Sequence, residues 1–261
     1  MPYTDLLYSA AGGVATITLN RPEKLNAFRQ QTLEELIDAF RSAAYDRSIG
    51  VIVFTGAGEK AFCVGGDISE MRDLDPQSGK RFVDTLFDLT GAIRQTRKPV
   101  LCKVRGYCLG GGHELHLFCD LTFAGEKARF GQTGPMVGSV PVWGGTQLIP
   151  RLVGDKRARE IVFGCKQYSA AEAKAMGLIN DCAPEEKLDG LVKEWCDRIL
   201  TMSPQALAIA KDSFNHALDT ETGALSHGLE LLRLLYGSEE LREGMSAFLE
   251  KRKPDFGKFR R

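Results

Sequence analysis

The sequence places a carboxylate among apolar residues just after a run of glycines. Glu114 lies in GYCLGGGHELHLFCD, residues 106–120, two positions after three consecutive glycines. On a helix that begins near these glycines, it would lie one turn from Leu117 and Phe118, on a largely apolar surface. Partial burial raises the pKa of a carboxyl group, so that it can exchange protons near neutral pH. Glu114 is therefore a candidate general acid or base, with a hydrogen-bonded structural glutamate as the alternative.

Two glycine-rich turns each follow an apolar strand. They are AFCVGGDISEM, residues 61–71, and the stretch that contains Gly111. A helix N-terminus there would present unpaired N–H groups and a partial positive charge, which stabilise an anion. Two such N–H groups aimed at one point would form an oxyanion hole for a carbonyl that becomes an enolate. Asp67, after Gly66, suits the N-cap position. Tight turns and close packing are the alternative, and neither stretch has a dinucleotide-binding or P-loop pattern.

The histidines and cysteines do not form a metal-binding pattern. His113 and His116 are three residues apart, but no third ligand is placed beside them. The seven cysteines are scattered, mostly between apolar residues, and no CxxC pair occurs. This usage is typical of buried reduced thiols in a cytoplasmic protein. We expect no metal and no redox cofactor.

The composition excludes several classes of partner. Lys+Arg and Asp+Glu balance at 34 each in 261 residues, so no overall attraction to nucleic acid or anionic lipid is expected. No apolar run approaches the ~20 residues that cross a bilayer. The first ten residues, MPYTDLLYSA, lack the basic and apolar regions of a secretory signal. We therefore expect a cytoplasmic protein that binds neither nucleic acid nor a membrane.

Strands and helices alternate over roughly the first 185 residues. Apolar patterns predict strands at 13–20, 50–55 and 99–104, and helical periodicity predicts helices at 31–44 and 82–93. Such alternation implies crossover connections and a mainly parallel sheet. Four helical segments without strand signals follow, at 185–200, 204–217, 224–235 and 239–251. We expect an α/β core, residues 1–200, and a helical C-terminal region, residues 201–261, that packs on its own core or on another subunit.

Six blocks of the sequence occur in the order that characterises one enzyme family. They are NRPEKLNAF (20–28), AFCVGGDISEM (61–71), KPVLCKVRGYCLGGGHEL (98–115), CDLTFAGEKARFGQ (119–132), GGTQLIPRLVG (144–154) and an A-x-x-A-x-x-x-G-L turn at 170–178. With these blocks the chain resembles the enoyl-CoA hydratase/isomerase, or crotonase, family over nearly its whole length. The resemblance implies a spiral of ββα turns, assembly as a homotrimer or homohexamer, and an acyl-CoA thioester as substrate.

The resemblance also assigns roles to residues. The two N–H groups that hold the thioester oxygen map to Gly66 and Gly111, and Glu114 takes the position of one of the hydratases' two catalytic glutamates. The family's further contacts with substrate map to Ala27, Val64, Asp67 and Ile68. Lys24 matches a loop near the adenine and phosphates of CoA, with a solvated surface lysine as the alternative. CoA would be part of the substrate, with no separate cofactor.

The chain departs from the two-glutamate pattern of the hydratases. The position of the second glutamate is Gly134. The surrounding FGQTGPMVGS, residues 130–139, and the C-terminal REGMSAFLEKRKPDFGKF instead resemble 1,4-dihydroxy-2-naphthoyl-CoA synthase and 2-ketocyclohexanecarboxyl-CoA hydrolase. Those enzymes have an aspartate where this sequence has Pro141, and an apolar residue where it has Glu114. The chain thus combines the outline of one subgroup with the carboxylate of another.

The match to this second subgroup adds further site residues. Thr133 and Ser139 would line the acyl pocket, while Tyr236 and Lys251 would reach a neighbouring subunit's site or its CoA. For Tyr236 the alternative is packing between helices. Trp143 is either a wall of the pocket or a core or interface residue.

The sequence therefore predicts a hydro-lyase that adds water to an α,β-unsaturated acyl-CoA, with a cyclic acyl group as one option. Glu114 would activate the water, and the two glycine amides would stabilise the enolate. A ring-forming or ring-cleaving acyl-CoA enzyme of the naphthoyl-CoA synthase type is the main alternative. An enoyl-CoA isomerase, in which one carboxylate moves a proton between carbons, is another. A non-catalytic CoA-binding or RNA-associated scaffold on the same fold is the last.

Overall fold

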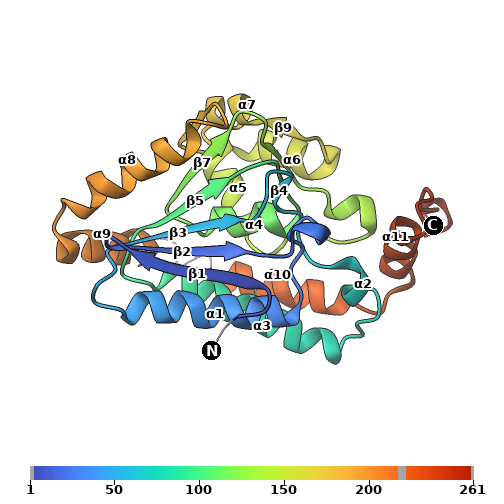
Figure 1. Cartoon of the computed structure of the whole chain (residues 1–261). Helices are drawn as coiled ribbons and strands as arrows, with labels where there is room; N and C mark the ends of the chain where they lie inside the picture. The colour runs from blue at the N-terminus through green and yellow to red at the C-terminus, as the bar shows by residue number, and fades with distance from the viewer. Residues whose placement is uncertain (1–2, 217–221, 260–261) are drawn as a thin grey trace.

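Two β-sheets and the helices around them form the fold (Figure 1). The computed structural model describes residues 3–216 and 222–259. The six-stranded sheet has the order β1-β2-β3-β5-β7-β10 and the four-stranded sheet the order β4-β6-β8-β9. The strands are β1 Leu6–Ala11, β2 Val14–Leu19, β3 Val51–Gly56, β4 Ala61–Cys63, β5 Val100–Val104, β6 Tyr107–Leu109, β7 Leu121–Gly125, β8 Arg129–Gly131, β9 Tyr168–Ser169 and β10 Asp181–Ala183.

Eleven α-helices and three short 3₁₀ turns accompany these strands in the described residues. The helices are α1 Gln30–Tyr45, α2 Ile68–Met71, α3 Ser78–Arg94, α4 Gly111–Leu117, α5 Gly145–Val153, α6 Asp155–Gly164, α7 Ala170–Ala175, α8 Leu188–Leu200, α9 Pro204–His216, α10 Thr222–Leu235 and α11 Glu239–Leu249. The 3₁₀ turns are Pro22–Lys24, Gly134–Val137 and Gly257–Phe259. The strands and helices predicted from periodicity are present, with ends shifted by a few residues. Ala217, the last residue of one predicted helix, lies outside the described residues.

Three successive units of the chain repeat the same path. Strand β3 lies in the large sheet, β4 follows in the small sheet, and helices α2 and α3 come next. The units β5-β6-α4 and β7-β8-α5 do the same. Strands β2, β3, β5, β7 and β10 pair in parallel, and only β1 runs antiparallel in this sheet. The predicted spiral of ββα turns and the mainly parallel sheet are thus confirmed.

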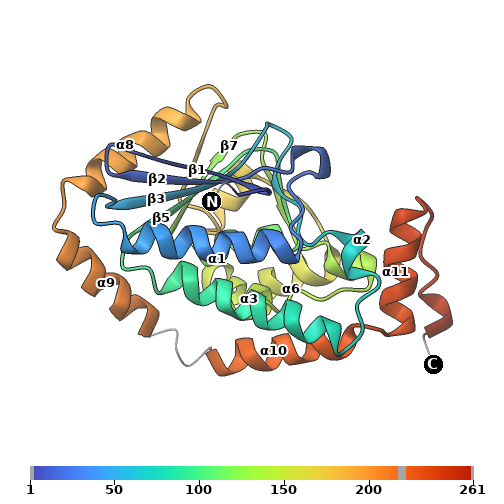
Figure 2. The same ribbon diagram turned by 60° about the horizontal axis from the view of Figure 1, so that its bottom comes forward.

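Helices cover both faces of the large sheet (Figure 2). Successive side chains of β3 point to opposite faces. Val51 and Val53 pack in a cluster with α8, whereas Ile52 and Phe54 belong to the main core with α1 and α3. Burial on both sides explains why β3 is a continuous apolar run.

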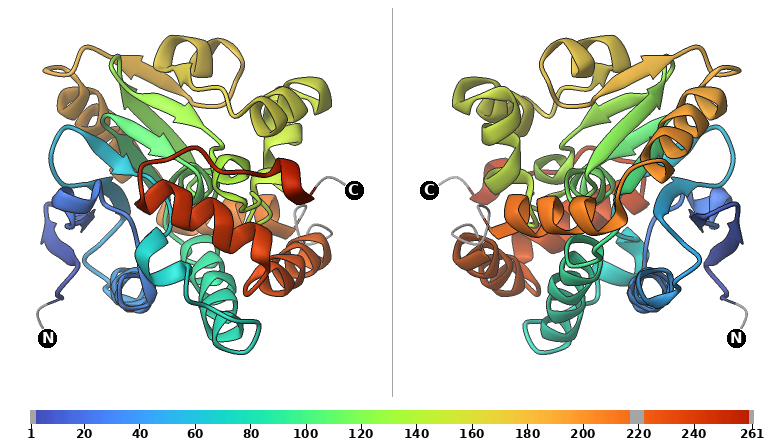
Figure 3. Two further views of the ribbon diagram at one scale, coloured as in Figure 1. Left: turned by 90° about the vertical axis from the view of Figure 1, so that its right-hand side faces the viewer. Right: turned by 90° about the vertical axis from the view of Figure 1, so that its left-hand side faces the viewer.

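The C-terminal helices pack on the protein's own core. Leu225, Leu229 and Leu232 of α10 are buried in the main core, and α10 contacts α3. Helices α8 and α9 lie at one end of the molecule and α11 at the other, beside α2 (Figures 1 and 3). The division at residue 200 and a role of this region in oligomers stay predictions. In the described residues, no helix combines the length and the apolar character that crossing a membrane requires.

Candidate active site

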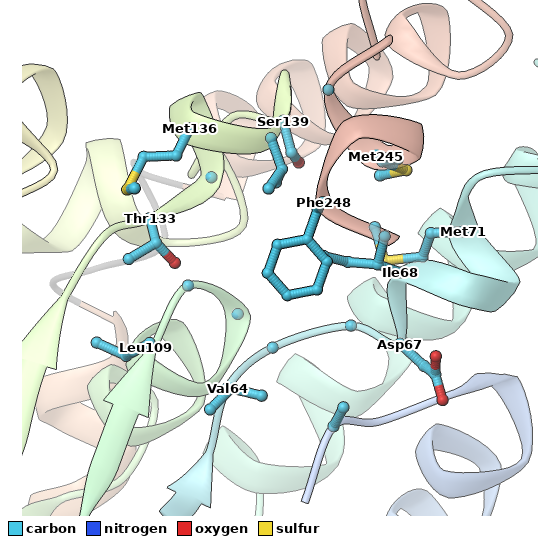
Figure 4. Close-up of a pocket in the computed structure, with 18 of the residues that line it drawn as sticks. Val64, Asp67, Ile68, Met71, Leu109, Thr133, Met136, Ser139, Met245 and Phe248 are labelled. Carbon is cyan, nitrogen blue, oxygen red and sulfur yellow. The ribbon is translucent and has the colours of Figure 1, made fainter. Parts of the chain in front are cut away.

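A cavity of about 770 Å³ lies where the turns after β4 and β6 meet α11 and the 3₁₀ turn Gly134–Val137 (Figure 4). Of the residues that the sequence assigns to the site, those that line it are Lys24, Ala27, Val64, Gly66, Asp67, Ile68, Gly111, Glu114, Thr133, Ser139, Trp143 and Tyr236. Lys251 does not line it. Lys251 lies just after α11, has a φ of 55° and is exposed. Its neighbours Arg252 and Lys253 line the cavity instead.

The pairing of the small sheet brings the two glycine turns together. Strands β4 and β6 run in parallel, with Cys63 opposite Cys108. The turns that follow these strands therefore leave the sheet side by side. A Cβ atom built on Gly65, whose φ is 101°, would lie 2.9 Å from the amide nitrogen of Gly111. Only a glycine permits this conformation and this approach without strain.

The amides of Gly66 and Gly111 have no acceptor among the described residues. Phe28 donates its N–H to the Gly65 carbonyl at 2.9 Å and accepts from the Asp67 N–H at 2.7 Å, which leaves the N–H of Gly66 unused between them. Gly111 is the first residue of α4, so its N–H has no carbonyl within the helix. Two free amides on adjacent turns at one cavity are the arrangement that an oxyanion hole needs.

Glu114 lies in the first turn of α4, and its side chain is buried at the cavity wall, with 5% of the residue exposed. Its Oε1 accepts a hydrogen bond from the N–H of Gly145, the first residue of α5, at 3.0 Å. Burial raises the pKa of Glu114 well above its ordinary value, although the amides of Gly145 and Trp143 oppose the shift. The buried carboxylate therefore takes up a proton more readily than an exposed glutamate does.

Tyr236 reaches the same cavity from the loop after α10 of its own chain. The ring is 1% exposed and packs edge-on against Phe82, with 6.3 Å between ring centroids. Its hydroxyl is buried and has no hydrogen-bond partner among the described residues. Burial, and to a lesser extent the charge of Glu114, raises the pKa of Tyr236. The structure places this residue at the cavity of its own chain, and a contact with a neighbouring subunit's site or its CoA stays a prediction.

Trp143 is both a wall of the cavity and a core residue. Its indole N–H donates to Thr90 Oγ1 at 2.8 Å and to the Leu86 carbonyl at 3.1 Å. Its ring packs edge-on against Phe28, with 5.9 Å between centroids. Trp143 thus lies between the cavity and the core, and its contact with substrate stays a prediction.

Asp67 caps α2, as predicted, and faces an arginine. Its Oδ1 accepts from the N–H of Ser69 at 3.1 Å, and its Oδ2 pairs with Arg21 at 3.0 Å. Arg21 also donates to the Ala27 carbonyl. The Asp67 carboxylate therefore joins the loop before α1 to the turn that carries Gly66, and this role was not predicted.

Several cavity residues were missed by sequence reasoning. Figure 4 shows the Phe248 ring pointing into the cavity, with the sulfurs of Met71 and Met245 nearby. Met245 and Phe248 are three residues apart on α11, which is a weak signal of a shared helix face. The close packing of α11 fixes which face that is, because a Cβ on Gly244 would lie 2.5 Å from the Val137 carbonyl.

The two histidines of α4 lie behind the cavity as a buried pair. Gln132 Nε2 is 3.0 Å from His113 Nδ1, and Thr122 Oγ1 is 3.2 Å from His116 Nδ1. Burial lowers the pKa of His113 to about 3. Among the described residues, no group of three or more His, Cys, Asp or Glu side chains is placed to hold a metal ion. All seven cysteines are free thiols.

These features define a class of protein: an α/β spiral in which two glycine amides and a buried carboxyl group converge on one mainly apolar cavity. The sequence matches the enoyl-CoA hydratase/isomerase family over residues 9–259, so the chain belongs to this family. The predicted family is confirmed.

Solved structures agree with this assignment. An enoyl-CoA hydratase from Mycobacterium avium subsp. paratuberculosis K-10 is 30% identical, with a TM-score of 0.88 over 98% of this chain and 99% of its own. An enoyl-CoA hydratase/isomerase from Xanthobacter autotrophicus Py2 is 31% identical, with a TM-score of 0.87 over 96% and 98%. An enoyl-CoA hydratase from Bacillus anthracis is 32% identical, with a TM-score of 0.79 over 97% and 98%.

Proposed function

We propose that this protein is an enoyl-CoA hydratase-like lyase that adds water to an α,β-unsaturated acyl-CoA. The observation that carries the proposal is the convergence of the free amides of Gly66 and Gly111 with the buried carboxyl group of Glu114 on one cavity. Family membership and the hydratases among the similar structures support it.

In this mechanism the two amides hold the thioester oxygen. They stabilise the negative charge that forms there when the thioester becomes an enolate, and losing one such donor typically costs ~3 kcal/mol of activation energy. Glu114, as carboxylate, takes a proton from water, and the resulting hydroxide equivalent attacks the β-carbon. The enolate then takes a proton at the α-carbon, from Glu114 or from an ordered water. Elimination of water is the same path in reverse.

The substrate is an acyl-CoA whose CoA part lies against basic residues of the cavity lining. Lys24 and Lys253 line the cavity and suit the phosphates of CoA, together with Arg252, which also pairs with Glu243 and Glu250. The rest of the lining is mainly apolar and includes four buried aromatic side chains, which favour a bulky or cyclic uncharged acyl group: Phe28, Phe82, Trp143 and Tyr236. CoA is thus part of the substrate, and no separate cofactor takes part.

We also propose a cytoplasmic homotrimer or homohexamer. Apolar side chains on α9 and α10 are exposed in the single chain and would be covered by other subunits. They are Ile209, Phe214, Leu231 and Leu234. Sedimentation of the purified protein distinguishes a monomer from either oligomer.

The direct test is turnover of crotonyl-CoA and of cyclic enoyl-CoAs by the purified protein. We expect water addition that falls by about 10²–10⁴-fold in Glu114→Gln. Glu194→Gln, on the exposed surface of α8, is the matched control and keeps full activity. Acyl-CoA binding without turnover of any candidate would instead indicate a non-catalytic CoA-binding protein.

A second candidate is a ring-forming or ring-cleaving acyl-CoA enzyme. It is favoured by Gly134, which lines the cavity without supplying the hydratases' second carboxylate, and by Thr133 and Ser139 beside it. Cleavage of a β-keto cyclic acyl-CoA that is insensitive to Glu114→Gln would establish this function and refute hydration. A shift of the double bond without water addition would establish the isomerase, in which Glu114 moves one proton between carbons.

A further inference from the structure

Two buried thiols lie directly beneath the glycine turns and have no part in the proposed reaction. Cys63 ends β4, Cys108 lies in β6, and the two residues are opposite each other in the parallel pair. Both are fully buried, with 0% of the residue exposed. The two strands lead directly into the turns that present the Gly66 and Gly111 amides.

Each thiol is hydrogen-bonded to the backbone next to one of these amides. Gly65 donates its N–H to Cys63 Sγ at 3.4 Å, and Gly65 is the residue before Gly66. Cys108 Sγ donates to the Gly112 carbonyl at 3.4 Å, and Gly112 is the residue after Gly111. The two sulfurs therefore contact the backbone of both turns, one residue before Gly66 and one residue after Gly111.

Cys63 also touches the second turn. A Cβ atom built on Gly112 would lie 2.8 Å from the Cys63 Cβ. The first turn of α4 therefore rests on the same residue whose sulfur holds Gly65.

The thiols are neutral in this environment. Burial raises the pKa of Cys63 to about 12, and burial followed by the neighbouring Cys63 raises the pKa of Cys108. A neutral thiol is a weak hydrogen-bond donor and acceptor rather than a nucleophile. The contacts with Gly65 and Gly112 use these two capacities, one in each turn.

We propose that Cys63 and Cys108 are positioning residues that fix the direction of the Gly66 and Gly111 amides. This inference rests on the proposed function, in which these amides hold the thioester oxygen. Stabilisation of an enolate depends on donors that are already aimed at the oxygen before reaction. A misplacement of ~1 Å at a catalytic group can cost ~10²-fold in rate. The sulfur contacts limit such movement from behind the turns, where no substrate reaches.

The experiment compares alanine with serine at each position. Both replacements remove the sulfur, but only serine keeps a group that donates and accepts hydrogen bonds, so the difference between them isolates the hydrogen bond from packing. Cys196→Ala is the control, because Cys196 is a buried thiol in the cluster between α8 and the sheet, away from the cavity. Circular dichroism identifies the variants that fold.

Two readouts are needed. The first is kcat and KM for the enoyl-CoA that the wild-type protein hydrates. The second is the infrared band of the thioester carbonyl in bound butyryl-CoA, which shifts when the amides polarise the carbonyl and requires no turnover. We expect Cys63→Ala and Cys108→Ala to lower kcat by about tenfold, with little change in KM, and to reduce the band shift. We expect Cys63→Ser and Cys108→Ser to recover most of both, and Cys196→Ala to change neither.

Equal behaviour of alanine and serine at both positions, or an undiminished band shift in the alanine variants, would overturn the proposal. If Cys63→Ala does not fold, the pair at Cys108 decides by the same criterion. Absence of turnover by the wild-type protein, with a band shift present, would count against hydration while the positioning role is still tested by the shift. Absence of any band shift in the wild-type protein would overturn both.

Discussion

A methyl group added to Gly65 tests whether the close approach of the two glycine turns is needed for activity. Gly65 has a φ of 101°, and the added Cβ would lie 2.9 Å from the amide nitrogen of Gly111. Backbone held in such a conformation by a non-glycine residue costs about 1–3 kcal/mol. The clash is with backbone, so the turns themselves must move apart, and both free amides move with them.

We therefore expect Gly65→Ala to lose about 2 kcal/mol of folding free energy and to lower kcat by roughly 10²-fold or more, as loss of one oxyanion donor does. Urea denaturation measures the first and steady-state hydration kinetics the second. Gly190→Ala is the control: nothing lies near a Cβ built on this residue of α8, so kcat stays unchanged. A folded Gly65→Ala protein with kcat within about twofold of wild type would refute the reasoning.

Three further predictions concern buried ionisable groups. The folded pKa of Glu114 is raised above 4.5, so its contribution to the stability of the wild-type protein falls as pH rises from about 4.5. We therefore expect Glu114→Gln to be more stable than wild type at pH 8 in thermal unfolding, with a gain that shrinks toward pH 4.5. The folded pKa of His113 is about 3, so the free energy of unfolding decreases as pH drops below about 6.5. We expect His113→Gln to reduce the dependence of this free energy on pH by up to about 1.4 kcal/mol per pH unit, the equivalent of one proton, in urea titrations. Lys211 is buried 2.6 Å from Asp120 and joins α9 to the core. We expect Lys211→Ala to lower the free energy of unfolding by about 3 kcal/mol in the same titrations. The control, Lys193→Ala on the surface of α8, lowers it by less than about 0.5 kcal/mol. A stability equal to that of the wild type across these conditions, in Glu114→Gln, His113→Gln or Lys211→Ala, would contradict the prediction for that variant.

The elements that position the site could be predicted because their signals are local. The apolar run of β3, the glycines after β4 and β6, and Glu114 on the helix that follows all depend on residues close in sequence. Motif order then gave the family, which the whole-chain match confirms. The cap formed by Asp67 was predictable for the same reason, since an N-cap involves residues two or three positions apart.

The remaining features depend on contacts between distant segments. The pairing of Cys63 with Cys108 follows from strand register, which spacing along the chain does not reveal. The orientation of α11, and with it Phe248, depends on the close fit between Gly244 and the Val137 carbonyl. Tyr236 was predicted as a site residue. Whether it lies at the cavity of its own chain or at that of a neighbouring subunit depends on the packing of α10.

The most direct test of the account is an experimental structure with a bound, unreactive saturated acyl-CoA. We predict the thioester oxygen about 2.7–3.1 Å from the amide nitrogens of both Gly66 and Gly111, with the Glu114 carboxyl group beside the α- and β-carbons. A thioester held elsewhere in the cavity, or amides that donate to protein groups while the acyl-CoA is bound, would contradict it.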